Sequence, residues 1–243
     1  MKTKKVLIKD GFWKKDLLWK LISLIFLLAF IVAGVKGNFF QKVLIRLNVI
    51  EKPMDPDYWA VRGWTNTLEQ LGYDADIVFF GNSITYGAHF NKYFQDLEVV
   101  NLGYPGDNIK GMLERLPQIR CLKPEKVFVM AGINNRGTSD DKFRMQYAEL
   151  IDSLLTVVPA ECIYVESMLP VNYFRKDHDN DDIVRRNGYI KTIANNKGCR
   201  FIDLHSVYSR NGELPAELTI DGLHLRDEAY SLWAEAIRRY VYE

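Results

Sequence analysis

Five short apolar runs, separated by stretches with helical periodicity, constrain the fold of this chain more than any other feature. A short, continuous apolar run bounded by turn residues is typical of a strand that is buried on both faces of a sheet. Alternation of such strands with helices predicts an α/β fold built on one doubly wound parallel sheet. The five runs are Ile77–Phe80, Val99–Leu102, Val127–Met130, Ile163–Val165 and Phe201–Leu204.

The stretches around these runs predict the helices. Apolar residues recur at helical spacing from Asp57 to Leu71, and Gly72 ends the pattern. At 243 residues the chain is long enough for one domain with a substantial core, and its sequence shows no internal repeat or second domain. Further helices are expected around residues 84–96, 108–118, 141–157, 184–197 and 227–240.

An apolar segment precedes this domain. Residues 21–35 carry no charged side chain, and residues 17–19 extend the apolar element if Lys20 reaches the lipid headgroups. A helix needs roughly 20 apolar residues to cross the hydrocarbon of a bilayer. A buried core helix is the alternative, but a surface that is apolar all round, behind seven lysines, favours a membrane helix.

The charges on both sides of this segment predict its orientation. Seven lysines precede it and four basic residues follow it before residue 53, which favours a cytoplasmic amino terminus and an extracytoplasmic domain. We therefore expect a single-pass protein of the cell membrane. Cleavage near Val32-Ala33-Gly34 would instead release a secreted domain. The expected parts are a basic cytoplasmic tail (1–20), a transmembrane signal-anchor (21–37), a juxtamembrane connector (38–56) and the folded domain (57–243).

The net charge of the folded part argues against nucleic acid as a partner. Residues 1–52 hold eleven Lys and Arg against three Asp and Glu, whereas the remainder holds 21 against 28. A mildly acidic domain lacks the basic surface that grips phosphates. The three cysteines, Cys121, Cys162 and Cys199, have no metal-binding spacing. A bridge between Cys162 and Cys199 is conceivable, but free thiols are favoured.

The turn Gly81-Asn82-Ser83 singles out one serine. Gly81 permits a sharp turn, and Ser83 then emerges at the carboxyl end of a buried strand, where open α/β sheets bind ligands. Serine is also a favoured helix N-cap, so the turn alone does not establish a nucleophile. A nucleophilic serine needs a base, a group that orients the base, and donors for an oxyanion.

Among the four histidines of the chain, His224 fits the role of this base. Asp221 precedes it by three residues, so the carboxylate could hold one ring nitrogen while the other faces Ser83. A helix-capping aspartate beside a packed histidine is the alternative. His89 is expected to be a surface or packing residue, and the other two histidines lie in a polar loop and at a strand end (His178, His205).

Two further strand ends offer neutral hydrogen-bond donors. Gly103 follows the second run, where a glycine permits close approach and is expected to leave its amide free. Asn134 and Asn135 follow the third run, and their side-chain amides can donate to an anionic transition state. Because the carboxyl ends of parallel strands meet at one edge of the sheet, we expect these donors to lie near Ser83.

The loop Asp177–Asp182 imitates the beginning of a calcium loop. Its sixth position is Asp182 where an EF-hand requires glycine, and its twelfth is Gly188 where an EF-hand requires glutamate. We interpret the loop as a solvated acidic rim. No metal ion and no cofactor are expected.

Four segments, taken together and in order, resemble the sequence blocks of the SGNH hydrolases, the GDSL-type esterases and lipases. The resemblance covers roughly residues 74–242. The stretch Asn101–Leu116 is similar to the platelet-activating-factor acetylhydrolase-like branch of that family. This resemblance implies a flavodoxin-like three-layer α/β/α sandwich with a five-stranded parallel sheet. The blocks are Gly81–Thr85, Asn101–Gly103, Gly132–Asn135 and Asp221–His224.

The same resemblance implies roles for individual residues. Ser83 would be the nucleophile, His224 the base and Asp221 the group that orients the base. The implied oxyanion hole consists of the amides of Ser83 and Gly103 and the side chain of Asn134.

Two positions depart from the family pattern. Asn82 stands beside the serine where the family usually has aspartate, and Asn135 stands where an aspartate usually follows the third-block asparagine. Neither residue lies on the inferred proton path. Both departures therefore bear on substrate preference more than on activity.

These features predict a membrane-tethered serine esterase of the cell envelope that cleaves short-chain, acetyl-like esters. The substrate is expected to be a small molecule or a glycan ester. One alternative is an O-acyltransferase that acts on envelope glycans, and another is a lysophospholipase or thioesterase. A membrane-anchored binding module without activity is disfavoured because all three triad residues are present.

Overall fold

The structure, a computed structural model, describes residues 17–24, 68 and 72–243. The chain divides into two units, Met1–Pro53 and Met54–Glu243. In the first unit, residues 17–24 are helical. None of the helices in the described residues combines the length and the apolar character that crossing a membrane requires. Most of the predicted span (25–37), the connector (38–56) and the predicted helix 57–71, except residue 68, lie outside the described residues.

The second unit is built on a five-stranded sheet in which all neighbouring strands run parallel. The strands are β1 (Ile77–Gly81), β2 (Val99–Gly103), β3 (Lys126–Met130), β4 (Ile163–Glu166) and β5 (Arg200–Ile202). Their order is β2-β1-β3-β4-β5, the order of flavodoxin-like folds. The predicted α/β fold with a parallel sheet is confirmed. Because the strand order reverses at β1 and β3, the carboxyl ends of these strands form the crevice where such sheets bind ligands.

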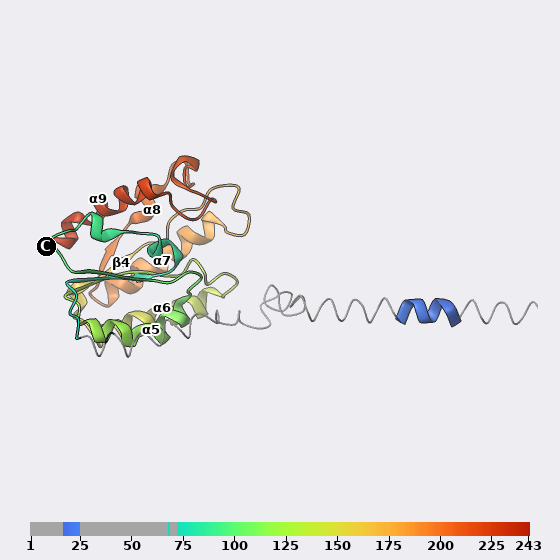
Figure 1. The fold of residues 1–243 in the computed structure, drawn as a ribbon, viewed down its shortest axis with the longest axis horizontal. Coiled ribbons are helices and arrows are strands. Elements are labelled where there is room, and N and C mark those ends of the chain that lie inside the picture. The colour runs from blue at the N-terminus through green and yellow to red at the C-terminus, as the bar shows by residue number, and fades with distance from the viewer. Residues whose placement is uncertain (1–16, 25–67, 69–71) are drawn as a thin grey trace, which may run out of the picture. The chain divides into compact units, whose positions relative to one another are not determined.

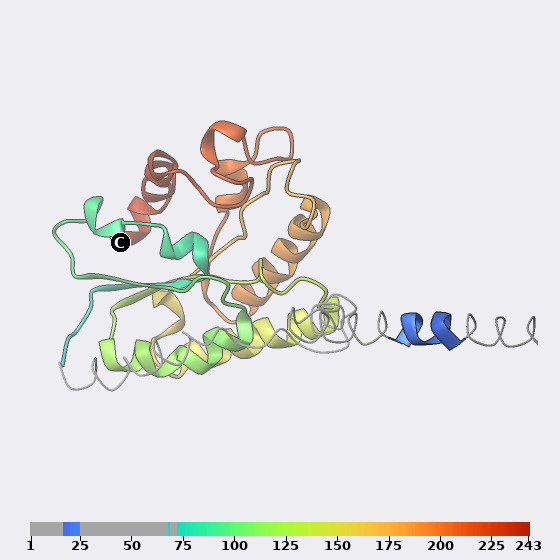
Figure 2. The same cartoon turned by 45° about the vertical axis from the view of Figure 1, so that its right-hand side comes forward.

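Helices cover both faces of this sheet. In residues 72–243 they are α4 (Ser83–Tyr86), α5 (Ile109–Leu122), α6 (Asp140–Leu155), α7 (Asn180–Asn196), α8 (Leu204–Tyr208) and α9 (Tyr230–Val241). In Figure 1, α5 and α6 lie below the sheet, and α8 and α9 lie above it. Helix α6 packs against both α5 and α7, and α8 packs against α9. Figure 2 shows the same layers after a turn of the molecule.

The helix predicted over residues 84–96 is wrong beyond its first turn. Helix α4 ends at Tyr86, and the amide of Gly87 donates to the carbonyl of Ser83. The chain then continues through a short 3₁₀ turn at Phe90–Lys92.

Two other predicted boundaries also shift. Strand β5 ends at Ile202 rather than Leu204, because the side chain of Asp203 accepts from the amide of Ser206 and thereby begins α8. Helix α5 continues past the predicted residue 118, because Ile119 and Leu122 extend its buried face.

Aromatic side chains join the sheet to α9 through the core. Phe79 of β1 stacks on Phe90, with ring centroids 3.7 Å apart. Trp233 of α9 meets Phe90 edge-on, with centroids 5.3 Å apart. All three side chains are buried. The segment that follows Ser83 is therefore held between β1 and α9.

The three cysteines are free thiols, as the sequence favoured. Cys199 is buried, and burial raises the pKa of its thiol to about 11. This thiol therefore stays protonated at neutral pH and is a poor nucleophile.

Glu166 is a buried carboxyl group at the end of β4 that should make stability depend on pH. Burial raises its pKa to about 8, although the indole of Trp233 donates to its Oε1 at 2.7 Å and opposes the shift. The folded state therefore holds a proton that the unfolded chain releases above about pH 4.5. Because the unfolded state binds fewer protons between that pH and pH 8, stability should fall as pH rises through this window.

Replacing Glu166 by glutamine should remove most of this dependence, because the amide keeps the acceptor for Trp233 without ionising. We expect Glu166→Gln to raise the free energy of unfolding at pH 8 by on the order of 1–3 kcal/mol. The measurement is denaturant unfolding between pH 5 and 9. Glu149→Gln, an exposed change on α6, is the control and should leave the slope unaltered. A wild-type stability that does not fall over this range contradicts a protonated Glu166.

Candidate active site

Ser83 stands at the carboxyl end of β1 as the first residue of α4. The N-cap of this helix is Asn82, whose Oδ1 accepts from the amide of Ile84 at 2.9 Å. The hydroxyl of Ser83 is therefore not used for capping. Asn82 therefore takes the N-cap role that the sequence had left open for Ser83.

The Ser83 hydroxyl, the His224 ring and the Asp221 carboxylate form one chain of hydrogen bonds. His224 Nε2 lies 2.9 Å from Ser83 Oγ, and His224 Nδ1 lies 2.9 Å from Asp221 Oδ2. When Nδ1 carries the proton, it donates to Asp221, and Nε2 is left to accept from Ser83. The structure thus brings together the three residues that the sequence predicts as a nucleophile, a base and an orienting group.

Asp221 is held by the backbone as well as by the ring. Its Oδ1 accepts from the amides of Leu223 and His224 at 3.1 and 2.8 Å. Burial alone raises the pKa of Asp221, but the hydrogen bonds from His224 and Leu223 outweigh burial and hold it at about 2. The carboxylate is therefore ionised near neutral pH and can stabilise positive charge on the imidazole.

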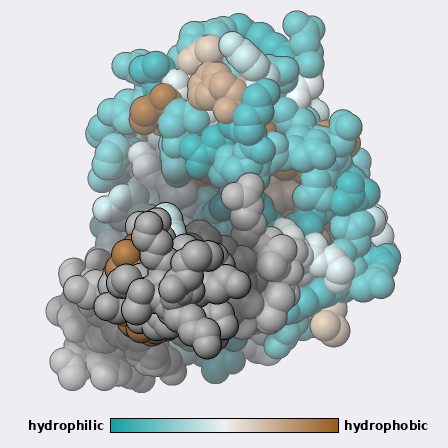
Figure 3. All heavy atoms as spheres, turned by 90° about the vertical axis from the view of Figure 1, so that its right-hand side faces the viewer, coloured by the Kyte–Doolittle hydropathy of each residue, from teal (hydrophilic) through white to brown (hydrophobic). Residues whose placement is uncertain are grey.

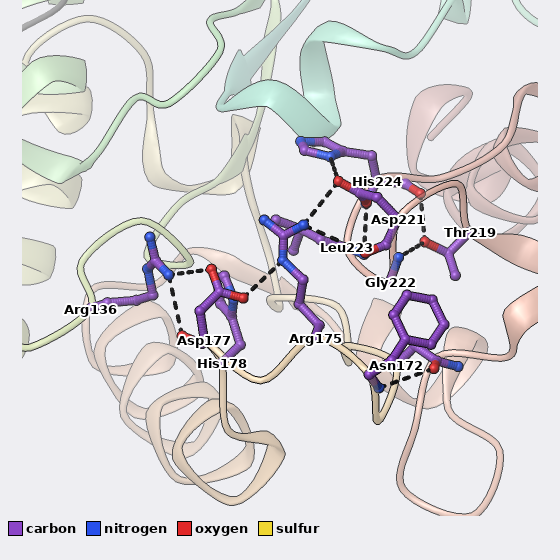
Figure 4. A network of polar contacts seen from close by, with 11 residues as sticks. Arg136, Asn172, Arg175, Asp177, His178, Thr219, Asp221, Gly222, Leu223 and His224 are labelled. Carbon is purple, nitrogen blue, oxygen red and sulfur yellow. Dashed lines mark hydrogen bonds and ion pairs between the residues drawn. The ribbon is translucent and has the colours of Figure 1, made fainter.

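The turn that carries Asp221 and His224 depends on Thr219 and Gly222 (Figure 4). The Thr219 hydroxyl donates to the carbonyl of His224 at 2.7 Å and accepts from the amide of Gly222 at 2.9 Å. Gly222 has a φ of +88°, and a Cβ there would lie 2.7 Å from the ring of Phe174. Glycine therefore permits both the turn and the close packing of the loop that follows β4.

Arg175, from that loop, contacts the Asp221 carboxylate (Figure 4). Its NH1 lies 3.0 Å from Asp221 Oδ2, the oxygen that also faces His224, and its Nε lies 2.9 Å from Asp177 Oδ1. Arg136 pairs with the other oxygen of Asp177. A row of alternating charges thus extends from Asp221 to the loop after β3. No sequence motif pointed to Arg175, which is 46 residues from Asp221.

The amide of Gly103 is engaged, so the prediction that it would be free is wrong. It donates to Asn101 Oδ1 at 2.8 Å, while Asn101 Nδ2 donates to the carbonyls of Thr85 and Ala88. Asn101 thereby ties β2 to the loop that follows α4. A Cβ on Gly103 would lie 2.2 Å from the amide nitrogen of Tyr86, so glycine is needed for the close approach of β2 and α4.

The two asparagines that follow β3 have different partners. Asn134 Nδ2 donates to the carbonyl of Asp107 at 2.7 Å, which orients the amide and uses one of its two hydrogens. Asn135 is buried, where its Oδ1 accepts from the amide of Ile109 at 3.1 Å and its Nδ2 donates to Gln146 Oε1 at 3.3 Å. Asn135 therefore joins the loop to α5 and α6. Asn134 keeps a hydrogen for another acceptor.

Arg115, which the sequence did not single out, braces this edge of the sheet. It is 1% exposed and donates to Asp107 Oδ2 from Nε and NH2 at 2.9 and 2.7 Å. It also donates to the carbonyls of Gly81 and Leu102, within the last two residues of β1 and β2. Burial raises the pKa of Asp107 to about 6 despite Arg115, so the carboxylate is still ionised at neutral pH. Arg115 thus holds Asp107 in place, and the carbonyl of Asp107 in turn orients the side chain of Asn134.

In the acidic loop 177–182, Asp177, Asp179 and Asp181 are exposed, as expected of the solvated rim that the sequence predicted, but several of the carboxylates also have protein partners. Arginines and a helix cap engage its carboxylates. Asp177 pairs with Arg136 and Arg175, Asp179 caps α7, and Asp182 pairs with Arg185 and Arg186.

Comparison with known proteins agrees with the motifs. The profile of the GDSL-like lipase/acylhydrolase family matches residues 79–232. Among curated proteins, the chain is 25% identical over 172 residues to the N-acylneuraminate cytidylyltransferase of Streptococcus agalactiae serotype III. The aligned region is 70% of this chain but 40% of that enzyme, so the chain spans less than half the length of this relative.

Solved structures are similar in fold. A Streptococcus pneumoniae protein, provisionally named a platelet activating factor, matches with a TM-score of 0.71 and 20% identity, over 86% of this chain and 99% of that one. A variant of an acetyl xylan esterase from Geobacillus stearothermophilus matches with a TM-score of 0.57 and 18% identity, over 70% and 96% of the two chains.

The family match extends over more than half of the chain. It includes the turn with Ser83, the ends of β2 and β3, and the turn with Asp221 and His224. The chain therefore belongs to the GDSL-like lipase/acylhydrolase family.

Proposed function

We propose that this chain is a serine esterase that removes short, acetyl-like acyl groups with Ser83, His224 and Asp221. The observation that carries the proposal is the continuous chain of hydrogen bonds, 2.9 Å from Ser83 Oγ to His224 Nε2 and 2.9 Å from His224 Nδ1 to Asp221 Oδ2. The likeness in fold to an acetyl xylan esterase supports a short acyl group.

The character of the surface supports a polar substrate. The loops that follow β4 and α8 extend to the right in Figure 1, and Figure 3 views the molecule from that side. Most of the described atoms on this face are hydrophilic (Figure 3), although the two loops also expose Tyr173, Phe174 and Ile220. Enzymes that bind lipid surfaces expose larger apolar patches.

In the first half-reaction, Ser83 Oγ attacks the ester carbonyl carbon while His224 Nε2 takes the hydroxyl proton. The Asp221 carboxylate stabilises the imidazolium that forms. The tetrahedral intermediate collapses when His224 returns the proton to the alcohol oxygen, which breaks the ester bond and leaves the acyl group on Ser83. In the second half, water attacks the acyl-enzyme with His224 again as base, and the acid is released.

The negative charge on the carbonyl oxygen needs fixed donors. We assign this role to the amide of Ser83 and the second hydrogen of Asn134. The amide of Gly103 can contribute only when it gives up Asn101 Oδ1, its partner at 2.8 Å.

A panel of esters tests this proposal. The purified full-length chain should hydrolyse acetyl esters faster than butyryl or octanoyl esters of the same alcohol, with release of the free acid. Preference for long acyl chains contradicts the short-chain assignment. Transfer of the acyl group to an added sugar, without free acid, would instead identify an acyltransferase.

We also propose that residues 21–37 anchor the chain in the cell membrane with the catalytic domain outside the cytoplasm. The absence of any charged side chain over residues 21–35 supports an apolar environment. The lysine excess before the segment supports the orientation. A reporter that works only after export should be active when fused after Glu243. Activity of a cytoplasm-only reporter there reverses the orientation.

A further inference from the structure

A pocket of about 360 Å³ lies between the loop after β3 and the beginning of α7. Two of its lining residues, Gly132 and Ile133, directly precede Asn134. A third, Asp177, pairs with Arg175, which in turn contacts Asp221 (Figure 4). The pocket is therefore linked on two sides to residues of the candidate active site. Its volume falls within the roughly 300–1,000 Å³ typical of sites for small ligands.

His178 is the lining residue that points to a ligand. Its side chain is 3% exposed, and its Nδ1 lies 3.2 Å from Asp177 Oδ1. Both ring nitrogens are buried, and neither makes a hydrogen bond within the part of the chain that the structure describes; the Asp177 carboxylate is near Nδ1 but not Nε2. A buried polar atom without a partner costs about 1–3 kcal/mol, and a ligand that supplies the partner recovers this cost.

The state of the ring defines what the ligand must offer. Burial lowers the pKa of His178, although Asp177 opposes this shift, so the imidazole is neutral at pH 7. When Nδ1 carries the proton and faces the Asp177 carboxylate, Nε2 presents a lone pair. The matching group is a neutral hydrogen-bond donor, and a hydroxyl fits this description.

The rest of the lining combines the apolar side chains of Ile133, Met168 and Ile183 with charged side chains that suit several hydroxyls. Arginine and lysine side chains add donors, and aspartates add acceptors. Several of these charges pair with one another, as Arg136 does with Asp177 and Arg186 with Asp182, so the pocket carries little net charge. Polar walls of both signs bind a polyhydroxyl group well, and they make burial of an apolar acyl chain unfavourable.

We propose that this pocket binds the alcohol part of the ester, and that this alcohol is a sugar whose hydroxyl donates to His178 Nε2. The inference rests on the proposed function, because the sugar is the leaving group of the ester that Ser83 attacks. A short acyl group needs little room of its own. The pocket beside Asn134 is therefore available for the alcohol.

The first test compares two acetyl esters, a mono-O-acetylated methyl glucoside and para-nitrophenyl acetate. In the full-length chain, His178→Leu should lower kcat/KM for the sugar ester about tenfold more than for the nitrophenyl ester, because one hydrogen bond is lost. The matched control is His205→Leu. His205, like His178, has a buried Nε2 without a hydrogen-bond partner among the described residues, but it does not line the pocket. The control should leave the ratio of the two rates unchanged.

A second pair of variants avoids disturbing the buried ring. Arg136 and Arg144 have side chains that are each 51% exposed and each pair with an aspartate, but only Arg136 lines the pocket. Arg136→Ala should lower the sugar-ester ratio severalfold, and Arg144→Ala should not. Methyl glucoside alone should also inhibit the wild type competitively.

The outcomes separate this inference from the proposed function. Suppose that the wild type hydrolyses para-nitrophenyl acetate. If His178→Leu and Arg136→Ala leave the ratio of kcat/KM for the sugar ester to kcat/KM for the nitrophenyl ester unchanged, including when both values fall equally, the pocket does not bind the alcohol. Absence of activity on the sugar ester alone overturns the inference in the same way. If the wild type hydrolyses neither ester, the proposed function itself is wrong.

Discussion

Replacing Ser83 by alanine should lower the turnover of para-nitrophenyl acetate by about 10⁴–10⁶-fold, the range expected when a serine nucleophile is removed. The reason is that His224 Nε2, 2.9 Å from Ser83 Oγ, then has no hydroxyl to deprotonate. The loss should appear in kcat, because no acyl-enzyme can form. A fluorophosphonate probe followed by peptide mass spectrometry should label Ser83 in the wild type and no serine in the variant.

Ser167 offers a matched control for this experiment. It also follows a strand, β4, but its Oγ accepts from the backbone amide of His205 at 2.7 Å rather than facing a ring nitrogen. Ser167→Ala should cost about 1 kcal/mol of stability and retain probe labelling and turnover. Labelling at a serine other than Ser83, or near-normal turnover in Ser83→Ala, would contradict the assignment of Ser83 as the nucleophile.

Replacing Asn134 by alanine should lower kcat by about 10²–10³-fold, which corresponds to roughly 3–4 kcal/mol of transition-state stabilisation. The Asp107 carbonyl already holds the Asn134 amide at 2.7 Å, so its second hydrogen is fixed in direction before the reaction begins. Such a donor strengthens as negative charge grows on the substrate oxygen. The loss should therefore fall mainly on kcat and not on KM.

Asn135→Ala is the comparison, and it should affect the stability of the fold more than the turnover. Asn135 accepts from the buried amide of Ile109, so its loss leaves that amide unpaired and should lower the free energy of unfolding by about 1–3 kcal/mol. Its kcat should fall much less than that of Asn134→Ala. Both variants are to be assayed on one activated acetyl ester after unfolding curves are recorded. If Asn135→Ala loses most of its kcat and Asn134→Ala keeps a normal kcat, the assignment of Asn134 to the oxyanion hole is wrong.

The sheet and the three central residues could be predicted because their signals are local. Ile77–Phe80 is a short apolar run followed by a glycine turn, and such a run has few structural alternatives. Asp221 and His224 are three residues apart. A single turn therefore brings the Asp221 carboxylate to the His224 ring, whatever the position of that turn relative to the sheet. Parallel strands then bring their carboxyl ends to one edge, which accounts for the approach of Ser83 to His224.

The remaining contacts depend on tertiary placement that no short pattern encodes. Arg115 lies on the buried face of α5 together with Met112 and Leu116, and a charged residue at such a position is a signal that could have drawn attention to it. Its targets on β1 and β2 are specified only once the sheet has formed. The Gly103 amide is engaged because the side chain of Asn101, two residues earlier, turns back to accept from it, and a glycine after a strand gives no sign of such a contact. Arg175 reaches Asp221 only because Gly222 lets the loop after β4 pack closely.

The contact between Ser83 and His224 joins residues that are 141 positions apart, with four of the five strands between them. During synthesis, the serine leaves the ribosome long before the histidine that we propose as its base. A nascent chain that has already paired β1 with β2 and β3 therefore carries an ordinary, unreactive hydroxyl at position 83. Reactivity toward esters or fluorophosphonates arises only when the turn before α9 docks against the finished sheet. With Ser83 as the proposed nucleophile, we expect the order in which the residues emerge to protect the growing chain from premature acylation.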